Sequence, residues 1–502
     1  MSTTKAVIFT HLGMTPEYAE KTREAGGRRD LMNRVAPIFR EYLRCRNVGL
    51  VYVYVDVGTQ LLIQRLSESV EGRGVSFSLE ELGLEERTRN CLKLAVDEVT
   101  QNLLDDQSIE FHPAQAPRFQ FVGLSHLLSL FNALYRIDPQ LIRDLAGKDQ
   151  VFTYDSPKFV EAVIRLRRSP HPIHGRHPIF RFDADVMVNQ SGIGELIAAV
   201  TQSWTLSMAS LFNLFSGGYG RADAPPDPLN DYAVRLYWLV DRATGELSER
   251  GLHFLRDLGE IGATQVPSSV QMSAAMSEYV RQKRGGRSSN RKSQQVISGA
   301  GLFISQDASR SLPPFMNSRQ MTTWIDDHLK RLLHEAVGHL DEESPEHLST
   351  ALFGQDRHPY GINEEYVKGA TNYFPRILRG CLLHALIMEA DGKTPGPLSR
   401  EVREVIANPE YVVDEAWLAG EMFRVASERA RDVLSIWKEA DYGDTPLRAW
   451  AAKSEARADE YARSIVADAL AYLRLVKRWP VYVQAIERLT PDRAYWLFRR
   501  VE

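Results

Sequence analysis

The chain has few cysteines, no long uncharged apolar run and no excess of either charge. Its 502 residues hold 3 cysteines, Cys45, Cys91 and Cys381, and such an odd, widely spaced set argues against a secreted disulfide framework. No run of about 18 apolar residues lacks a charge, so no membrane-spanning helix is predicted. The N-terminus lacks the apolar core of a signal peptide. We therefore expect a cytoplasmic protein.

The near balance of charges also limits the choice of partners. Lys and Arg number 61 and Asp and Glu 65, which gives a net charge of −4 and no general attraction to nucleic acid. With 44% hydrophobic and 25% charged residues, the composition is that of a globular protein, which excludes a fibrous or low-complexity chain. We expect no nucleic-acid partner, and any anionic ligand needs a local basic site.

Short β-branched and aromatic runs alternate with helical patterns over the first two hundred residues. The patterns predict strands at 5–10, 48–57, 119–124, 150–154 and 178–189. They predict helices between them at 31–46, 126–137, 158–168 and 192–204. This alternation predicts an α/β fold with a mostly parallel, Rossmann-like sheet and helices on both faces. In such sheets, ligands bind beyond the carboxyl ends of the strands.

The last part of the chain has a helical pattern almost throughout. Apolar residues recur at helical spacing over 377–389, 411–439, 446–477 and 481–488. We therefore predict an all-helical C-terminal domain over 381–502, after a first domain over 1–380.

Two aspartates close the strand predicted at 178–189. In an extended strand Asp183 and Asp185 point to the same face, with their Cα atoms about 7 Å apart. Their mutual repulsion inside an apolar strand is costly unless a ligand compensates it, and two carboxylates can share Mg²⁺ or Mn²⁺. The alternative is that the strand leaves the core here, with both aspartates solvated or capping the next turn.

The segment Phe182-Asp-Ala-Asp-Val186 resembles the metal motif of the GT-A-type nucleotide-sugar-dependent glycosyltransferases. The resemblance implies a GT-A-like catalytic domain over 1–380 with insertions. It implies that Asp183 and Asp185 hold Mn²⁺ or Mg²⁺, which bridges the diphosphate of a nucleoside-diphosphate sugar donor, and that a downstream histidine, His339, completes the site. The acceptor is then a hydroxyl group of a sugar or small molecule.

A second acidic pair opens a predicted helix over 322–340. Asp326 and Asp327 lie in its first turn, where the helix dipole stabilises a carboxylate. In the GT-A resemblance this region looks like the catalytic base, with Asp327 first and Asp326 second. The alternative is structural: Thr323 and Asp326 form a capping-box-like pair, and Asp327 pairs with Arg331. The apolar stripe of this helix comprises Ile325, Leu329, Leu332, Leu333, Ala336 and Leu340.

The end of the same helix favours another class of enzyme. His334, Glu335 and His339 form His-Glu-x-x-x-His, which resembles the zinc motif of the modulator-of-gyrase type metallopeptidases. Positions i and i+5 lie about 140° apart around a straight helix, so Gly338 must end or kink the helix to bring His339 round. A zinc metallopeptidase is therefore one alternative function, and a non-catalytic helical scaffold is the other.

Three further features have a structural and a functional interpretation. Arg284 and Arg287 belong to a basic, glycine- and serine-rich tract, either a surface loop or a lid over the donor phosphates. Asp155 follows a predicted strand and either contacts the nucleotide or forms a turn. Arg474–Trp479 leaves peripheral membrane contact and homo-oligomer formation open, with packing inside the helical domain as the default.

Overall fold

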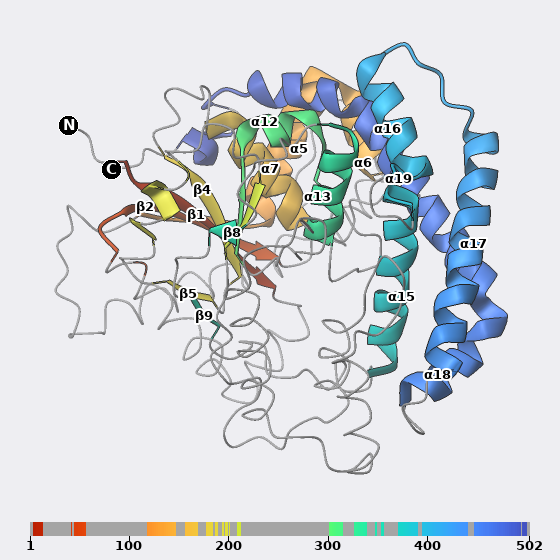
Figure 1. The fold of residues 1–502 in the computed structure, drawn as a ribbon. Coiled ribbons are helices and arrows are strands. Elements are labelled where there is room, and N and C mark those ends of the chain that lie inside the picture. Colours follow the sequence, from red (N-terminus) through yellow and green to blue (C-terminus); the bar gives the residue numbers. More distant parts are fainter. Residues whose placement is uncertain are drawn as a thin grey trace, which may run out of the picture.

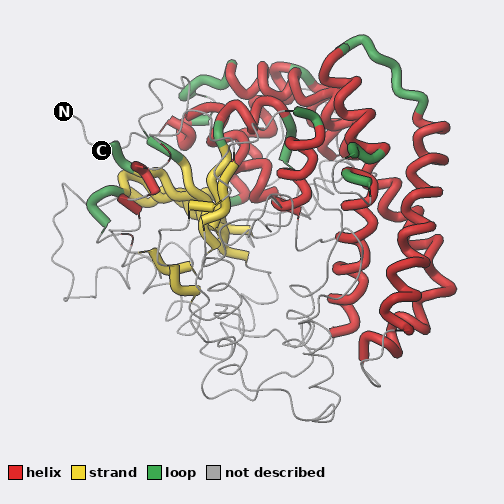
Figure 2. The backbone as a smooth tube through the Cα atoms, in the orientation of Figure 1, coloured by secondary structure: helices red, strands yellow, loops and turns green. Residues whose placement is uncertain are grey.

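A computed structural model describes a mostly parallel sheet, helices packed on it and a C-terminal group of long helices (Figure 1). The strands gather in one part of the molecule and the long helices in another (Figure 2). The structure describes residues 4–13, 42, 45–56, 118–146, 156–168, 177–183, 186–188, 193–194, 196–198, 200, 208–211, 301–314, 326–338, 347–348, 353–355, 370–389, 394–439, 446–492 and 494–498.

The described strands form a seven-stranded sheet in the order β3-β2-β1-β4-β7-β6-β8. Its strands are β1 (Ala6–Gly13), β2 (Val48–Asp56), β3 (Arg118–Val122), β4 (Ile179–Asp183), β6 (Met208–Leu211), β7 (Gly301–Ile304) and β8 (His347–Leu348). β7 runs antiparallel to both of its neighbours, and the other strands all run the same way. A separate two-stranded antiparallel sheet pairs β5 (Val186–Val188) with β9 (Phe353–Gln355).

The central strands are buried on both faces. In β1 and β2, every residue of Ala6–Phe9 and of Leu50–Tyr54 is at most 1% exposed. Parallel strands covered on both sides have such continuous apolar sequences. The structure confirms the mostly parallel sheet and the strands predicted at 5–10, 48–57 and 119–124. The strand predicted at 150–154 lies outside the described residues, and so does the helix predicted at 31–46, apart from Tyr42, which is helical, and Cys45 and Arg46, which are not.

One predicted strand is wrong in an informative way. The run 178–189 is two strands in different sheets, because β4 ends at Asp183 and β5 begins at Val186. The break falls at Asp183-Ala184-Asp185, and aspartate and alanine are depleted in strands, so the tripeptide was a local sign of it. Alternation along one strand therefore no longer places Asp183 and Asp185 on the same face.

Helices cover one face of the sheet. They are α5 (Leu124–Ile137), α6 (Pro139–Ala146), α7 (Ser156–Arg168), the 3₁₀ helix η4 (Tyr495–Phe498) and part of α19 (Ala458–Glu487), all joined with Phe9, Tyr52 and their neighbours in one apolar cluster. The Tyr52 hydroxyl donates to the carbonyl of Trp496 at 3.2 Å. The opposite face presents Ile8, Val51 and Val53, which are also buried. The described residues do not show which elements cover that face, so helices on both faces stay a prediction.

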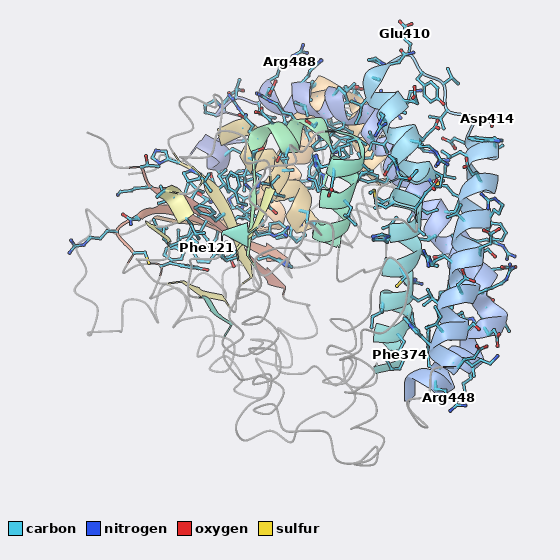
Figure 3. The ribbon with its side chains drawn as sticks, viewed as in Figure 1. Phe121, Phe374, Glu410, Asp414, Arg448 and Arg488 are labelled. Atoms are coloured by element: carbon cyan, nitrogen blue, oxygen red, sulfur yellow. The ribbon has the colours of Figure 1, made fainter. Side chains whose placement is uncertain are left out.

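The C-terminal region is helical, as predicted. Its elements are α13 (Asp326–Ala336), α15 (Ala370–Ile387), α16 (Pro397–Ala407), α17 (Glu415–Glu439), α18 (Pro446–Ser454), η3 (Glu455–Arg457) and α19. Their apolar faces form a second cluster, which also includes Leu332 and Leu333 of α13, so the division at residue 381 stays a prediction. In Figure 3, Glu410 and Asp414 lie at the rim of this region, in the connection between α16 and α17.

The long helix α19 joins the two apolar clusters. It has 30 residues, which corresponds to about 45 Å. Its first half packs in the helical cluster, and its second half packs on the sheet side. There the Trp479 indole N–H donates to the Ser309 carbonyl at 2.9 Å, and the Tyr482 hydroxyl donates to the Leu141 carbonyl at 2.6 Å. The break predicted near Pro480 is wrong, because the helix continues through it.

Candidate functional site

The order of the sheet reverses between β1 and β4. From β1 the chain moves outward to β2 and β3, and it then returns to the other side of β1 as β4. β1 and β4 are parallel, so their carboxyl ends meet at one edge of the sheet. In open α/β sheets, ligands bind beyond the carboxyl ends of the strands at such a point of reversal. The candidate site is therefore the edge where β1 and β4 end.

Asp183 ends β4 at this edge. The strand register joins Val122 to Tyr54, Tyr54 to His11, and His11 to Asp183, which makes one row across β3, β2, β1 and β4. Neighbouring strands are about 4.8 Å apart, so the row is about 14 Å long. The strand-end position predicted for Asp183 is observed. Its side chain and the whole of Asp185 lie outside the described part, so cation binding by the pair stays a prediction.

His11 lies beside Asp183 and was not singled out from the sequence. Its ring centroid is 5.8 Å from that of Tyr54, with 39° between the planes, and Tyr54 is 1% exposed. The residues before it in β1 are fully buried, whereas His11 is half-buried. A histidine near the end of the first strand of an α/β pattern was the available signal.

A buried group of charges anchors β4 to α7. The Glu161 carboxylate contacts the Arg165 guanidinium at 2.7 Å and that of Arg181 at 3.0 Å. Nη1 of Arg165 also donates to the carbonyls of Ile179, at 2.7 Å, and Ile304, at 2.6 Å, and so joins β4 to β7. Arg181 precedes Asp183 by two residues on the same strand. Sequence reasoning missed this network; an arginine and a glutamate inside apolar runs were the signal.

The second acidic pair opens a helix, as predicted. α13 begins at Asp326, with Asp327 next, but their side chains lie outside the described part. The helix ends at Ala336, earlier than predicted, because Gly338 adopts a left-handed backbone with φ of 79°. Arg403 of α16 donates to the Ala336 carbonyl at this end. The part of the prediction in which Gly338 ends the helix is confirmed.

The first two residues of the peptidase motif face different environments. His334 is fully buried beside the helical cluster, and Glu335 is exposed. In a zinc peptidase helix, the histidine ligand and the glutamate base serve one metal-bound water. His339 lies outside the described residues. Within the described part, no group of three or more His, Cys, Asp or Glu side chains is placed to hold a metal.

The remaining predicted site residues are not brought to this edge by the described structure. Asp155, Arg284 and Arg287 lie outside the described residues. In the segment Arg474–Trp479, Trp479 is 1% exposed and packs on the sheet side, while Arg474 pairs with Glu415 at 2.5 Å.

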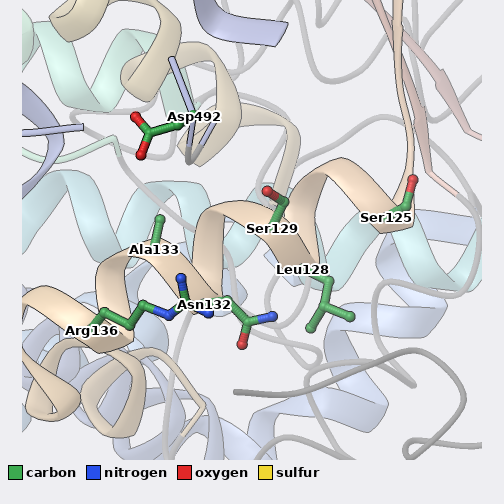
Figure 4. Close-up of a pocket in the computed structure, with 7 residues that line it drawn as sticks. All are labelled: Ser125, Leu128, Ser129, Asn132, Ala133, Arg136 and Asp492. Carbon is green, nitrogen blue, oxygen red and sulfur yellow. The ribbon is translucent and has the colours of Figure 1, made fainter. Parts of the chain in front are cut away.

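A polar cavity lies on the outer side of α5. It has a volume of about 310 Å³, at the small end of the range for ligand sites. Figure 4 shows Asp492 across from a stripe of α5 residues, and the cavity is lined by Ser125, Leu128, Ser129, Asn132, Ala133, Arg136 and Asp492. It shares no residue with the carboxyl ends of β1 and β4 and is a separate hollow.

No family model, curated protein or solved structure matches the chain. Among the helices of the described part, none is long and apolar enough to cross a membrane.

Proposed function

We propose that the protein is a metal-dependent glycosyltransferase of the GT-A type, which transfers a sugar from a nucleoside-diphosphate sugar to a hydroxyl acceptor. The observation that supports it is the position of Asp183 at the carboxyl end of β4, next to β1, where the sheet order reverses. The order β3-β2-β1-β4 matches the start of the doubly wound order of nucleotide-binding folds, which favours the Rossmann-like, GT-A form of the sheet.

The donor set suits a hard divalent cation. Asp183 and Asp185 supply carboxylate oxygens, which Mn²⁺ and Mg²⁺ prefer, and the GT-A resemblance implies a histidine, His339, as a further ligand. When bound, such a cation neutralises the charge that develops on the departing diphosphate. Two carboxylates that approach each other repel, and a cation held between them relieves that repulsion.

The other predicted residues act on the acceptor and the donor. The acceptor oxygen forms a bond to the anomeric carbon, the bond from that carbon to the diphosphate oxygen breaks, and the acceptor proton passes to the Asp327 carboxylate. Asp326 orients the same hydroxyl. Arg284 and Arg287 cover the phosphates, and Asp155 contacts the nucleoside.

Ligand-induced thermal stabilisation tests this function. Wild-type protein is melted with UDP- and GDP-sugars, with and without Mn²⁺, and donor hydrolysis is followed in parallel. A ligand at 100 times its dissociation constant stabilises the folded state by about 2.7 kcal/mol, which is easily measured. We expect Mn²⁺-dependent stabilisation and slow donor hydrolysis in the wild type, and neither in Asp183→Asn or Asp185→Ala.

Asp307→Asn is the matched control. Asp307 is an exposed carboxylate that follows the carboxyl end of β7, and β7 is the reversed strand, so this residue lies at the opposite edge of the sheet. Its variant should behave as the wild type. The proposal is wrong if no nucleotide sugar stabilises the protein, or if the stabilisation depends on neither Mn²⁺ nor Asp183. Stoichiometric zinc that is lost in His334→Ala would instead indicate the peptidase.

A further inference from the structure

We propose that His11 is a protein ligand of the same cation, beside Asp183, and that its imidazole sets the preference for Mn²⁺ over Mg²⁺. This inference rests on the proposed function and adds a residue to its site.

The strand register places the two residues side by side. β1 and β4 pair in parallel from Val7 with Ile179 to His11 with Asp183. Register partners on neighbouring strands occupy the same face of a sheet, about 4.8 Å apart. An imidazole and a carboxylate that start from such neighbouring positions reach a common point with no change in the backbone.

The residues packed around His11 hold its imidazole in place, as a metal ligand requires. On the β2 side, the buried Tyr54 ring lies against the imidazole, at 5.8 Å between centroids. On the same face of β1, Val7 and Phe9 are at most 1% exposed, and His11 is half-buried. Its Nε2 atom is buried. Imidazole is the commonest protein ligand for transition metals.

No other described histidine occupies an equivalent position. His177 lies before the amino end of β4, where its Nδ1 is 3.0 Å from the Lys5 carbonyl. His126 belongs to the first turn of α5 and contacts Trp496. His328 and His334 belong to α13 and His384 to α15, and His347 belongs to β8, the last strand on the far side of the sheet from β1. Within the described part, the topology therefore brings His11 to Asp183.

The chemistry of the two cations makes the inference measurable. Mg²⁺ prefers oxygen donors, whereas divalent first-row transition metals also bind imidazole, with an affinity that rises from Mn²⁺ to Cu²⁺. A site of carboxylates and imidazole therefore discriminates against Mg²⁺. Removal of the His11 imidazole takes away one nitrogen donor, so the ratio of Mn²⁺ to Mg²⁺ affinity falls.

The test measures metal binding to the full chain without a sugar donor. Free Mn²⁺ is titrated by electron paramagnetic resonance, Mg²⁺ is used as competitor, and pulsed spectra of bound Mn²⁺ report coupling to ligand nitrogen. In the wild type we expect one bound Mn²⁺ with imidazole nitrogen coupling. In His11→Asn and His11→Ala we expect loss of the coupling to one imidazole, an affinity for Mn²⁺ lower by about tenfold or more, and a reduced preference over Mg²⁺.

His177→Ala is the matched control, because it removes a histidine from the other end of the same two strands and should change none of these values. Nitrogen coupling that is absent from the wild type, or that is undiminished in His11→Asn, overturns the inference; in the second case the nitrogen comes from another histidine, such as His339. If Asp183→Asn alone abolishes Mn²⁺ binding, the proposed function stands without His11. A wild type that binds no Mn²⁺ overturns both proposals.

Discussion

The buried charge network behind the site gives a sharp test of how β4 is held in place. In Glu161→Gln, a carboxylate that contacts two guanidinium groups at 2.7 and 3.0 Å becomes a neutral amide of almost the same shape. The three side chains are between 3% and 9% exposed, so water cannot solvate the guanidinium groups that lose their anionic partner. Removal of one partner from a buried ion pair costs about 3–5 kcal/mol.

Hydrogen exchange of the β4 amide protons is the assay, because it reports the local stability of the strand. A cost of about 3–5 kcal/mol corresponds to a loss of protection of about two to three and a half powers of ten. Urea unfolding followed by circular dichroism gives the global value for comparison.

Glu487→Gln is a control of matched chemistry. Glu487 contacts Arg310 at 2.7 Å, the same distance as in the buried pair, but these side chains are 38% and 37% exposed. An exposed ion pair contributes about 0–1 kcal/mol, and its contribution falls further with added salt. If Glu161→Gln lowers the free energy of unfolding by no more than Glu487→Gln does, burial does not strengthen this network and the prediction is wrong.

Three further predictions concern other parts of the fold. Thr10→Val should raise the free energy of unfolding in urea by about 1 kcal/mol, because Oγ1 of Thr10 is buried without a hydrogen-bond partner in the described part; a loss of stability would show that the hydroxyl is bonded. Gly396→Ala should lower it by about 1–3 kcal/mol, since a Cβ there lies 2.5 Å from the Leu386 carbonyl oxygen, whereas Gly420→Ala, in open space on α17, should be neutral or stabilising; equal effects would contradict this. The hydrogen bond from Arg474 lowers the pKa of Glu415, so its stabilisation is present above the unfolded-state pKa and is lost as pH falls through the folded value. Arg474→Gln should therefore flatten the stability profile below about pH 5 in urea unfolding, and an unchanged profile would argue against the pair.

The sequence predicts the regular elements best where local pattern and tertiary environment agree. The continuous apolar runs of β1 and β2 match a sheet buried on both sides, and Asp183 is found at a strand end as predicted. The helix break at Pro480 is wrong because the neighbouring residues Trp479 and Tyr482 are buried against the sheet cluster, and this packing outweighs the local cost of proline.

The residues that sequence reasoning missed meet only through the topology. His11 and Asp183 are register partners although 172 residues separate them, the difference between 183 and 11. Arg165 joins the Ile179 and Ile304 carbonyls, which are remote from each other along the chain. Such pairs leave no periodic signal in one sequence, because the strand order that brings them together is a property of the whole fold.

A crystal structure of the protein with Mn²⁺ and UDP, with anomalous data collected at the manganese edge, tests the central claim most directly. The account predicts one manganese peak at the carboxyl end of β4, in contact with Asp183, Asp185 and the imidazole of His11. Aspartate carboxylates turned away from each other with no metal between them, or a peak at another place in the chain, would contradict it.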